Sequence, residues 1–174
     1  MYTFVTGGFR SGRSNYALRR AAELGAPPWL YVSTGRETDE AVRKRIERHR
    51  RDIEAIWRVA VMPPKLHDLL KAETLAGLGA AVFDGLAAWI EEHLAASPPD
   101  KDASLLDEIT EFADRLYRST VPIVLTSTEM SLGMEPADAS DKRLLKIVSS
   151  ANQILGAQAT GMVMMVSGVP LKVR

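Results

Sequence analysis

The chain of 174 residues contains no cysteine. This absence excludes a disulfide framework, a thiol nucleophile and a zinc–thiolate centre, and it agrees with a reducing cytoplasm. Net charge is also absent, because 22 Lys and Arg balance 22 Asp and Glu. Nucleic acid is therefore not an expected partner, since the protein has no net positive charge to attract a polyanion. The sequence lacks both a signal peptide and any run of 18 uncharged apolar residues, so we expect no membrane span and no export.

Short apolar runs alternate with amphipathic segments along the chain. The apolar runs predict strands at residues 2–6, 29–34, 57–62, 80–83 and 122–126. Helical spacing of apolar residues predicts helices at 12–24, 39–56, 66–75, 86–96, 104–118 and 141–155. A hairpin is expected from residues 162–166 and 170–173. This order predicts an α/β fold in one domain, 1–174: a mainly parallel sheet with helices on both faces and a C-terminal antiparallel hairpin.

A glycine-rich segment separates the first predicted strand from the first predicted helix. Its residues are Gly7, Gly8, Phe9, Arg10, Ser11, Gly12, Arg13 and Ser14. They match the phosphate-loop pattern G-x-x-x-x-G-K-[ST], except that Arg13 replaces the lysine. Backbone N–H groups of such a loop bind phosphate at the positive end of the following helix.

We therefore expect this loop to bind a nucleotide, with Ser14 on Mg²⁺. Arginine is longer and forked, so phosphate binding is expected to be kept better than phosphoryl transfer. The alternative is a glycine-rich turn that binds nothing.

Phosphate-loop proteins carry a second acidic residue at the end of a nearby buried strand, where it holds Mg²⁺ directly or through water. Asp84, which ends the run AAVFD, is the candidate for this role. The same residue is equally suited to be the N-cap of the helix that begins near Leu86. The two roles are compatible, and only the glycine loop favours the metal.

Residues 43–51, RKRIERHRR, place six basic side chains around His49. On a helix, Arg45, Arg48 and His49 share one face. A solvated helix surface is the alternative reading of such a charge run. Beside a phosphate loop, the positive neighbours should lower the pKa of His49, whose imidazole would then stay neutral and nucleophilic.

These segments together resemble the family of bifunctional adenosylcobinamide kinases and adenosylcobinamide-phosphate guanylyltransferases. The resemblance runs nearly end to end and rests on VTGGFRSGRS, YVSTGRETDEAVRKRIERHR, FDGLAAWI, TSTEMSLGMEP, and ANQILG followed by VSGVPLKV. It implies a RecA-like P-loop fold in a homotrimer. It also implies two activities that use GTP or ATP. One phosphorylates adenosylcobinamide, and the other transfers GMP from GTP to adenosylcobinamide phosphate through a guanylyl-histidine.

The resemblance also implies which residues form the site. The histidine that accepts GMP matches His49. Further nucleotide contacts match Ser33, Thr34, Gly35, Arg50, Arg51, Asp52, Ile53 and Asp84. The arginines around His49 agree with this role, because they would stabilise charge that develops on phosphoryl oxygens during attack.

Four positions depart from the family pattern. Arg13 replaces a lysine, Val61 an acidic residue and Ala87 a threonine, and the Thr-Asn-Glu segment gains one residue as TSTE at 126–129. These departures leave two alternatives open. One is a paralogue that binds GTP or a corrinoid and has lost kinase activity, and the other is a P-loop kinase for a different small metabolite. The retained His49 favours a working guanylyltransferase.

Overall fold

The structure, a computed structural model, describes residues 1–34, 44, 57–133 and 135–174. Its centre is a seven-stranded sheet with the strand order β3-β2-β4-β5-β1-β6-β7. The strands are β1 (Tyr2–Gly7), β2 (Trp29–Ser33), β3 (Trp57–Val61), β4 (Ala80–Asp84), β5 (Ile123–Thr126), β6 (Gly161–Val166) and β7 (Val169–Lys172). Neighbouring strands are parallel except β6 and β7. The predicted parallel sheet is confirmed, but only β7 runs antiparallel, because β6 pairs parallel to β1.

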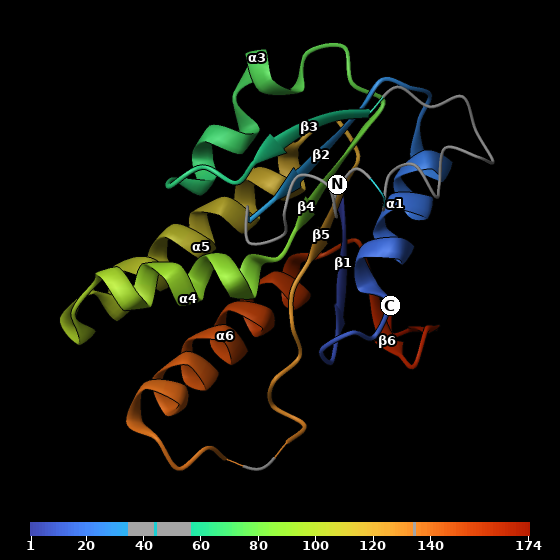
Figure 1. The fold of residues 1–174 in the computed structure, drawn as a ribbon. Coiled ribbons are helices and arrows are strands. Elements are labelled where there is room, and N and C mark those ends of the chain that lie inside the picture. The colour runs from blue at the N-terminus through green and yellow to red at the C-terminus, as the bar shows by residue number, and fades with distance from the viewer. Residues whose placement is uncertain (35–43, 45–56, 134) are drawn as a thin grey trace.

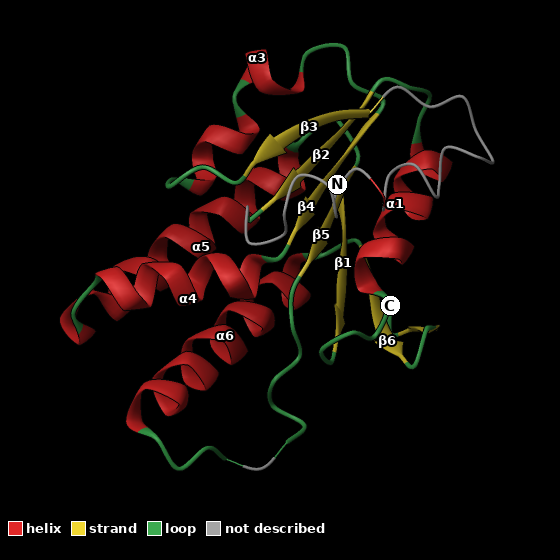
Figure 2. Cartoon of the chain, viewed as in Figure 1, coloured by secondary structure: helices red, strands yellow, loops and turns green. Residues whose placement is uncertain are grey.

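Helices cover both faces of the sheet (Figures 1 and 2). Helix α1 (Arg13–Leu24) packs on one face against a core that includes Val5, Val82 and Val124. Helices α4 (Leu86–Ala96), α5 (Asp102–Arg118) and α6 (Ala139–Gln158) pack on the other face, against the alternate residues of the same strands. The central strands are buried on both sides, which explains their continuous apolar runs in the sequence.

Two helices differ from their prediction. Residues 66–75 form a 3₁₀ helix, η1 (Leu66–Leu70), and a single turn, α3 (Ala72–Leu75), because Lys71 between them is extended, with ψ 143°. The last helix begins earlier than predicted because the Asp138 side chain caps it, accepting from the backbone N–H groups of Ser140 and Asp141. A short 3₁₀ helix, η2 (Pro99–Lys101), occupies the turn before α5.

The predicted helix 39–56 lies outside the described residues except for Lys44, which is helical. Within the described part, none of the helices has the length and apolar character needed to span a membrane.

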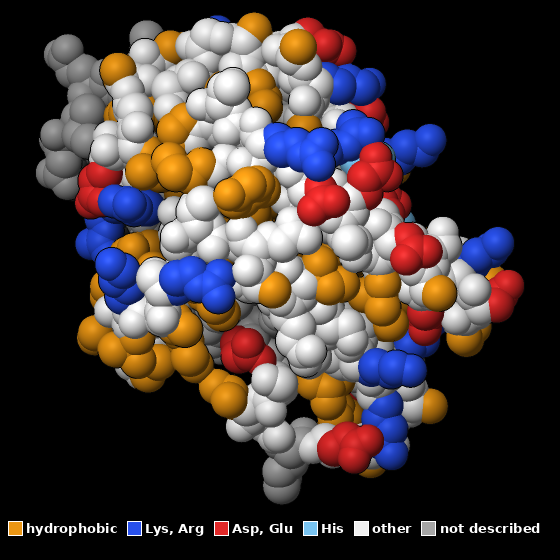
Figure 3. Space-filling view, turned by 180° about the vertical axis from the view of Figure 1, so that it is seen from behind, with side chains coloured by type: hydrophobic (Ala, Val, Ile, Leu, Met, Phe, Trp, Pro, Cys, Tyr) orange, Lys and Arg blue, Asp and Glu red, His pale blue; other side chains and the backbone are white. Residues whose placement is uncertain are grey.

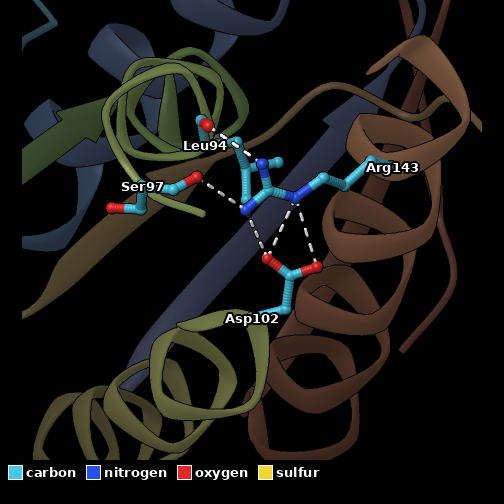
Figure 4. A network of polar contacts seen from close by, with 4 residues as sticks. All are labelled: Leu94, Ser97, Asp102 and Arg143. Carbon is cyan, nitrogen blue, oxygen red and sulfur yellow. Dashed lines mark hydrogen bonds and ion pairs between the residues drawn. The ribbon is translucent and has the colours of Figure 1, made fainter. Parts of the chain in front are cut away.

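Arg143 of α6 forms polar contacts with both α4 and α5, the other two helices on this face of the sheet (Figure 4). Its Nη2 lies 2.7 Å from Oδ1 of Asp102, at the start of α5. The same guanidinium donates to the carbonyl oxygens of Leu94 and Ser97, each at 3.0 Å, where α4 ends. Carbonyls in the last turn of a helix lack intrahelical partners, so the arginine satisfies them. The hydrogen bonds that Arg143 donates to the Asp102 carboxylate raise the pKa of Arg143. This network fixes α6 relative to α4 and α5.

Candidate active site

The carboxyl ends of β1, β5, β4 and β2 lie side by side at one edge of the sheet. Ser33 at the end of β2 is in register with Asp84 at the end of β4, and Thr126 at the end of β5 is in register with Val5. Ligands of open parallel sheets bind outside this edge. The described residues predicted for the site, 7–14, 33–34 and 84, all reach it.

The glycine-rich loop connects β1 to α1 as its motif predicts. Residues 10–15 line a hollow of about 200 Å³. Gly12 is the N-cap of α1, so the positive end of the helix dipole lies at this hollow. Arg10 adopts a left-handed φ of 57°, an uncommon conformation that proteins retain mostly at functional sites. Phe9 is 86% exposed at the tip of the loop.

The C-terminal hairpin supports the loop from behind. Gly168, in the turn between β6 and β7, donates its backbone N–H to the carbonyl oxygen of Ser11 at 3.0 Å. Gly7 approaches β6 so closely that a Cβ would lie 2.5 Å from the carbonyl oxygen of Met165. The position therefore excludes any side chain. This support joins distant parts of the chain, and the loop motif carries no signal for it.

Arg13 projects from α1 across the ends of β1 and β5. Its Nη1 donates to the carbonyl oxygen of Gly7 and, at 3.0 Å, to that of Ser127. Burial lowers the pKa of Arg13, and the negative charge of Asp84 opposes this effect. Arginine nevertheless stays protonated in proteins, so a fixed positive charge lies at the sheet edge beside Asp84.

Two buried hydroxyl groups near the loop lack a hydrogen-bond partner among the described residues. They belong to Ser11, within the loop, and to Ser127, directly after β5. Native proteins leave few buried polar groups unsatisfied, so such groups need an explanation. A polar ligand at the phosphate loop would provide the missing partners.

Asp84 lies at the end of β4 and is only 8% exposed. Its Oδ1 accepts a hydrogen bond of 2.5 Å from Oγ1 of Thr126, and its Oδ2 accepts one from the hydroxyl of Tyr31. The alternative role as helix N-cap is wrong, because Gly85 is the N-cap of α4 and no side chain caps that helix. The carboxylate is instead held at the sheet edge.

Tyr31 and Thr126 therefore belong to the site, although the sequence analysis does not identify them. Tyr31 precedes Ser33 by two residues, and alternate residues of a strand share a face. That spacing is a usable signal once β2 is known to pair with β4. Thr126 opens the segment TSTE, which the family resemblance singles out, but its contact with Asp84 depends on the position of β5 next to β4 in the sheet.

The remaining predicted contacts divide into two groups. Ser33 is buried at the end of β2, and Thr34 packs against Gly85, where a Cβ would lie 3.0 Å from Cγ2 of Thr34. Both residues thus lie next to Asp84. Gly35, His49, Arg50, Arg51, Asp52 and Ile53 lie outside the described residues.

A parallel sheet, a glycine-rich loop between its first strand and helix, and a buried carboxylate two strands away define a nucleotide-binding protein of the P-loop class. The chain also matches, over residues 3–173, the family described as cobinamide kinase / cobinamide phosphate guanyltransferase. The protein belongs to this family. This match confirms the resemblance seen in the sequence motifs. The protein is therefore an enzyme of cobalamin biosynthesis, both a kinase and a guanylyltransferase.

Three curated proteins are similar to the chain over its whole length. Two are named bifunctional adenosylcobalamin biosynthesis protein CobU. The one from Salmonella typhimurium strain LT2 is 28% identical and the one from Escherichia coli K12 is 26% identical, with full coverage of both chains in each case. The third is the bifunctional adenosylcobalamin biosynthesis protein CobP from Pseudomonas aeruginosa, which is 29% identical over all of this chain and 98% of that protein.

Proposed function

We propose that this protein, as a single nucleotide-binding domain spanning 1–174, phosphorylates adenosylcobinamide with GTP or ATP. In a second reaction it transfers GMP from GTP to adenosylcobinamide phosphate. One observation carries the proposal: the phosphate loop, the guanidinium of Arg13 and the carboxylate of Asp84 meet at one edge of the sheet. This is the arrangement that phosphoryl and nucleotidyl transfer require, because both depend on positioning and on electrostatic stabilisation.

Mg²⁺ is part of this proposal, and the chain has donors of the right chemistry. The cation prefers oxygen ligands and commonly takes one or two from the protein, with waters and substrate phosphates completing its shell. The hydroxyl of Ser14 and the carboxylate of Asp84 are such ligands. Bound there, Mg²⁺ would neutralise charge on the phosphates. Tyr31 and Thr126 would orient the carboxylate through the hydrogen bonds described above.

Arg13 is compatible with a working kinase. Both of its hydrogen bonds to carbonyl groups come from Nη1. A guanidinium has five N–H donors, so those of Nε and Nη2 can bind phosphate oxygens. The residue would then serve two purposes: it would hold the ends of β1 and β5 together and stabilise the negative charge of the triphosphate.

The guanylyl transfer is proposed to proceed through His49. The neutral imidazole nitrogen attacks the α-phosphorus of GTP, an N–P bond forms, and the bond to the bridging oxygen breaks as pyrophosphate leaves. A phosphate oxygen of adenosylcobinamide phosphate then attacks the same phosphorus and releases His49. The support comes from the sequence, where basic residues at 43–45, 48, 50 and 51 surround the histidine.

The first test is to incubate the protein with Mg²⁺ and GTP labelled at the α-phosphate, and then to denature it. We expect an acid-labile label on the wild type and none on His49→Ala. The matched controls His67→Ala and His93→Ala should keep the label. A wild type that binds GTP but takes no label would favour the binding paralogue. Phosphorylation of another metabolite without label would favour a different P-loop kinase.

A homo-oligomer, a trimer by family resemblance, and a cytoplasmic location complete the proposal. Support for assembly comes from the hairpin, where Val166, Val169, Leu171 and Val173 are between 44% and 59% exposed. Val166 faces Val169 across the ladder. Figure 3 shows hydrophobic side chains gathered at the lower left of the view, where the hairpin lies. Exposed apolar patches of this kind mark interaction surfaces.

Light scattering is expected to give three times the chain mass of 19.1 kDa. Leu171→Glu places a charge among the exposed apolar side chains of the hairpin, so it should weaken assembly and lower that mass. A monomeric wild type would contradict the assembly.

A further inference from the structure

The two most exposed large apolar side chains among the described residues lie on neighbouring segments at the carboxyl edge of the sheet. Phe9, in the loop after β1, is 86% exposed, and Leu132, in the segment after β5, is 73% exposed. Strands β1 and β5 are parallel neighbours. The backbone N–H of Glu129 donates to the carbonyl oxygen of Gly7 at 2.9 Å, so the two segments leave the sheet side by side (Figure 1). We name Phe9 and Leu132 the apolar pair.

The backbone of the phosphate loop holds Phe9 in its exposed position. Ser11 donates its N–H to the carbonyl oxygen of Gly8 at 3.2 Å, which closes a turn around Phe9 and Arg10. Gly168 in turn donates to the carbonyl oxygen of Ser11 and supports that turn. Single exposed apolar side chains are common on protein surfaces, so exposure alone indicates no function. The position of the apolar pair is what matters, because open parallel sheets bind their ligands outside this edge.

The hollow at the phosphate loop is too small to enclose a phosphoryl acceptor as well as a triphosphate. Its volume is about 200 Å³, and its lining begins at Arg10, the residue after Phe9. A pocket that encloses a drug-sized molecule has roughly 300–1,000 Å³. The attacking oxygen of the acceptor must nevertheless come within about 3–3.5 Å of the terminal phosphate. A large acceptor therefore lies outside the hollow, across the surface that borders it, and the apolar pair belongs to that surface.

We propose that the apolar pair contacts the corrinoid acceptor through its apolar surface, while the reacting hydroxyl of the acceptor lies at the phosphate loop. This inference rests on the proposed function, in which the acceptor is adenosylcobinamide. An aromatic ring suits such a ligand, because it offers a large rigid contact area at a low cost in conformational entropy. The triphosphate, in contrast, is bound by backbone N–H groups of the loop, which do not depend on these two side chains.

Phe9→Ala is the first test. The Kd and the KM for adenosylcobinamide should rise about tenfold, because the ring is no longer buried on binding. Phe9→Trp keeps an aromatic ring and should restore binding to within about twofold of the wild type. The KM for GTP should stay within about twofold of the wild type in Phe9→Ala, since alanine keeps the backbone N–H groups that bind phosphate. The Tm should not fall, because the ring is exposed in the folded protein.

Leu132→Ala tests the second member of the pair and should weaken acceptor binding about threefold, since less apolar area is lost. Tyr117→Ala is the matched control. Tyr117 is an exposed aromatic residue near the end of α5, which precedes β5 and therefore lies at the opposite edge of the sheet. Its removal should leave the Kd for adenosylcobinamide unchanged.

The heat capacity change of binding gives a readout specific to apolar contact. Binding is measured by calorimetry at several temperatures, on the nucleotide-free protein and on the protein saturated with a non-hydrolysable GTP analogue, so the result does not depend on turnover. Apolar burial makes this heat capacity change negative. It should be negative for the wild type and smaller in magnitude for the variant that combines Phe9→Ala with Leu132→Ala.

The outcomes distinguish this contact from other roles of the pair. An unchanged Kd for adenosylcobinamide in the combined variant overturns the proposal. A higher KM for GTP with an unchanged acceptor Kd would place Phe9 against the nucleotide, and a lower mass in light scattering would place the pair in a subunit interface. Either result, without weakened acceptor binding, overturns the proposal too.

Failure of the contact and failure of the proposed function give different results. Weakened binding in the variants, with a wild type that binds adenosylcobinamide but never turns it over, supports the contact and contradicts only the proposed function. Normal turnover by the wild type, with variants that bind as tightly as it does, supports the function and overturns the contact. A wild type that does not bind adenosylcobinamide in either form overturns the contact as well.

Discussion

Asp84→Asn is expected to lower kcat roughly a hundredfold or more for both phosphoryl transfer and GMP transfer. The carboxylate interacts electrostatically with Arg13 at the sheet edge and is the proposed ligand of Mg²⁺. Asparagine keeps the shape of the side chain and an oxygen that can accept from Thr126, but it removes the charge. The fold should therefore survive while the site loses its affinity for the cation.

The measurement is kcat as a function of Mg²⁺ concentration, with Tm as the check on folding. Tyr31→Phe and Thr126→Val are the matched controls, because each removes one hydrogen bond to Asp84 and leaves the carboxylate in place. We expect each control to reduce kcat by only about fivefold, the effect of a less well oriented ligand. An Asp84→Asn variant with wild-type kcat and wild-type Mg²⁺ dependence would remove Asp84 from the catalytic site.

Much of the fold could be predicted because the central strands are buried on both faces. Runs such as WLYV and AAVF are apolar without interruption, which is typical of a parallel sheet covered by helices. The order of the strands could not be predicted in the same way. That β5 lies between β1 and β4 depends on pairings between residues far apart in the chain. Residues 66–75 have apolar spacing of helical type, yet the extended backbone of Lys71 divides them.

The same distinction applies to the site. The phosphate loop is a local pattern in which spacing, glycines and the following helix are all read from consecutive residues. Asp84 could be named from the end of its strand, but excluding its role as a helix cap required the observed N-cap at Gly85. Its partners Tyr31 and Thr126 likewise emerge only from the packed sheet. The support that Gly168 gives to Ser11 arises only from tertiary packing, as do the buried hydroxyl groups of Ser11 and Ser127 that have no partner among the described residues.

The largest effect on stability is expected for Gly79→Ala, which should destabilise the protein by about 3 kcal/mol. Gly79 precedes β4 and packs backbone against backbone on the turn that precedes β2. A Cβ on Gly79 would lie 1.7 Å from the carbonyl oxygen of Ala26, and one on Gly25 would lie 2.1 Å from the carbonyl oxygen of Gly79. Backbone atoms cannot rotate away as the end of a flexible side chain can. The hydrogen bond of 3.0 Å from Gly79 to the carbonyl of Pro28 would be lost as the turns separate.

Two other glycines provide a graded control, measured by thermal and denaturant unfolding. Gly77 has open space around it but a φ of +69°, so alanine there should cost only about 1 kcal/mol of backbone strain. Gly133 has its nearest contact at 4.0 Å and no positive φ, so alanine there should leave the Tm unchanged. Gly79→Ala should lower the Tm by about 10 °C.

A Gly79→Ala variant as stable as Gly133→Ala would show that close packing between Gly79 and the turn before β2 is not required for stability. The clash lies at the amino end of β4, whereas Asp84 lies at its carboxyl end. Below its Tm, the folded variant should therefore keep the wild-type kcat. A substitution at the amino end of β4 would then lower stability alone, whereas one at Asp84 would lower catalysis alone.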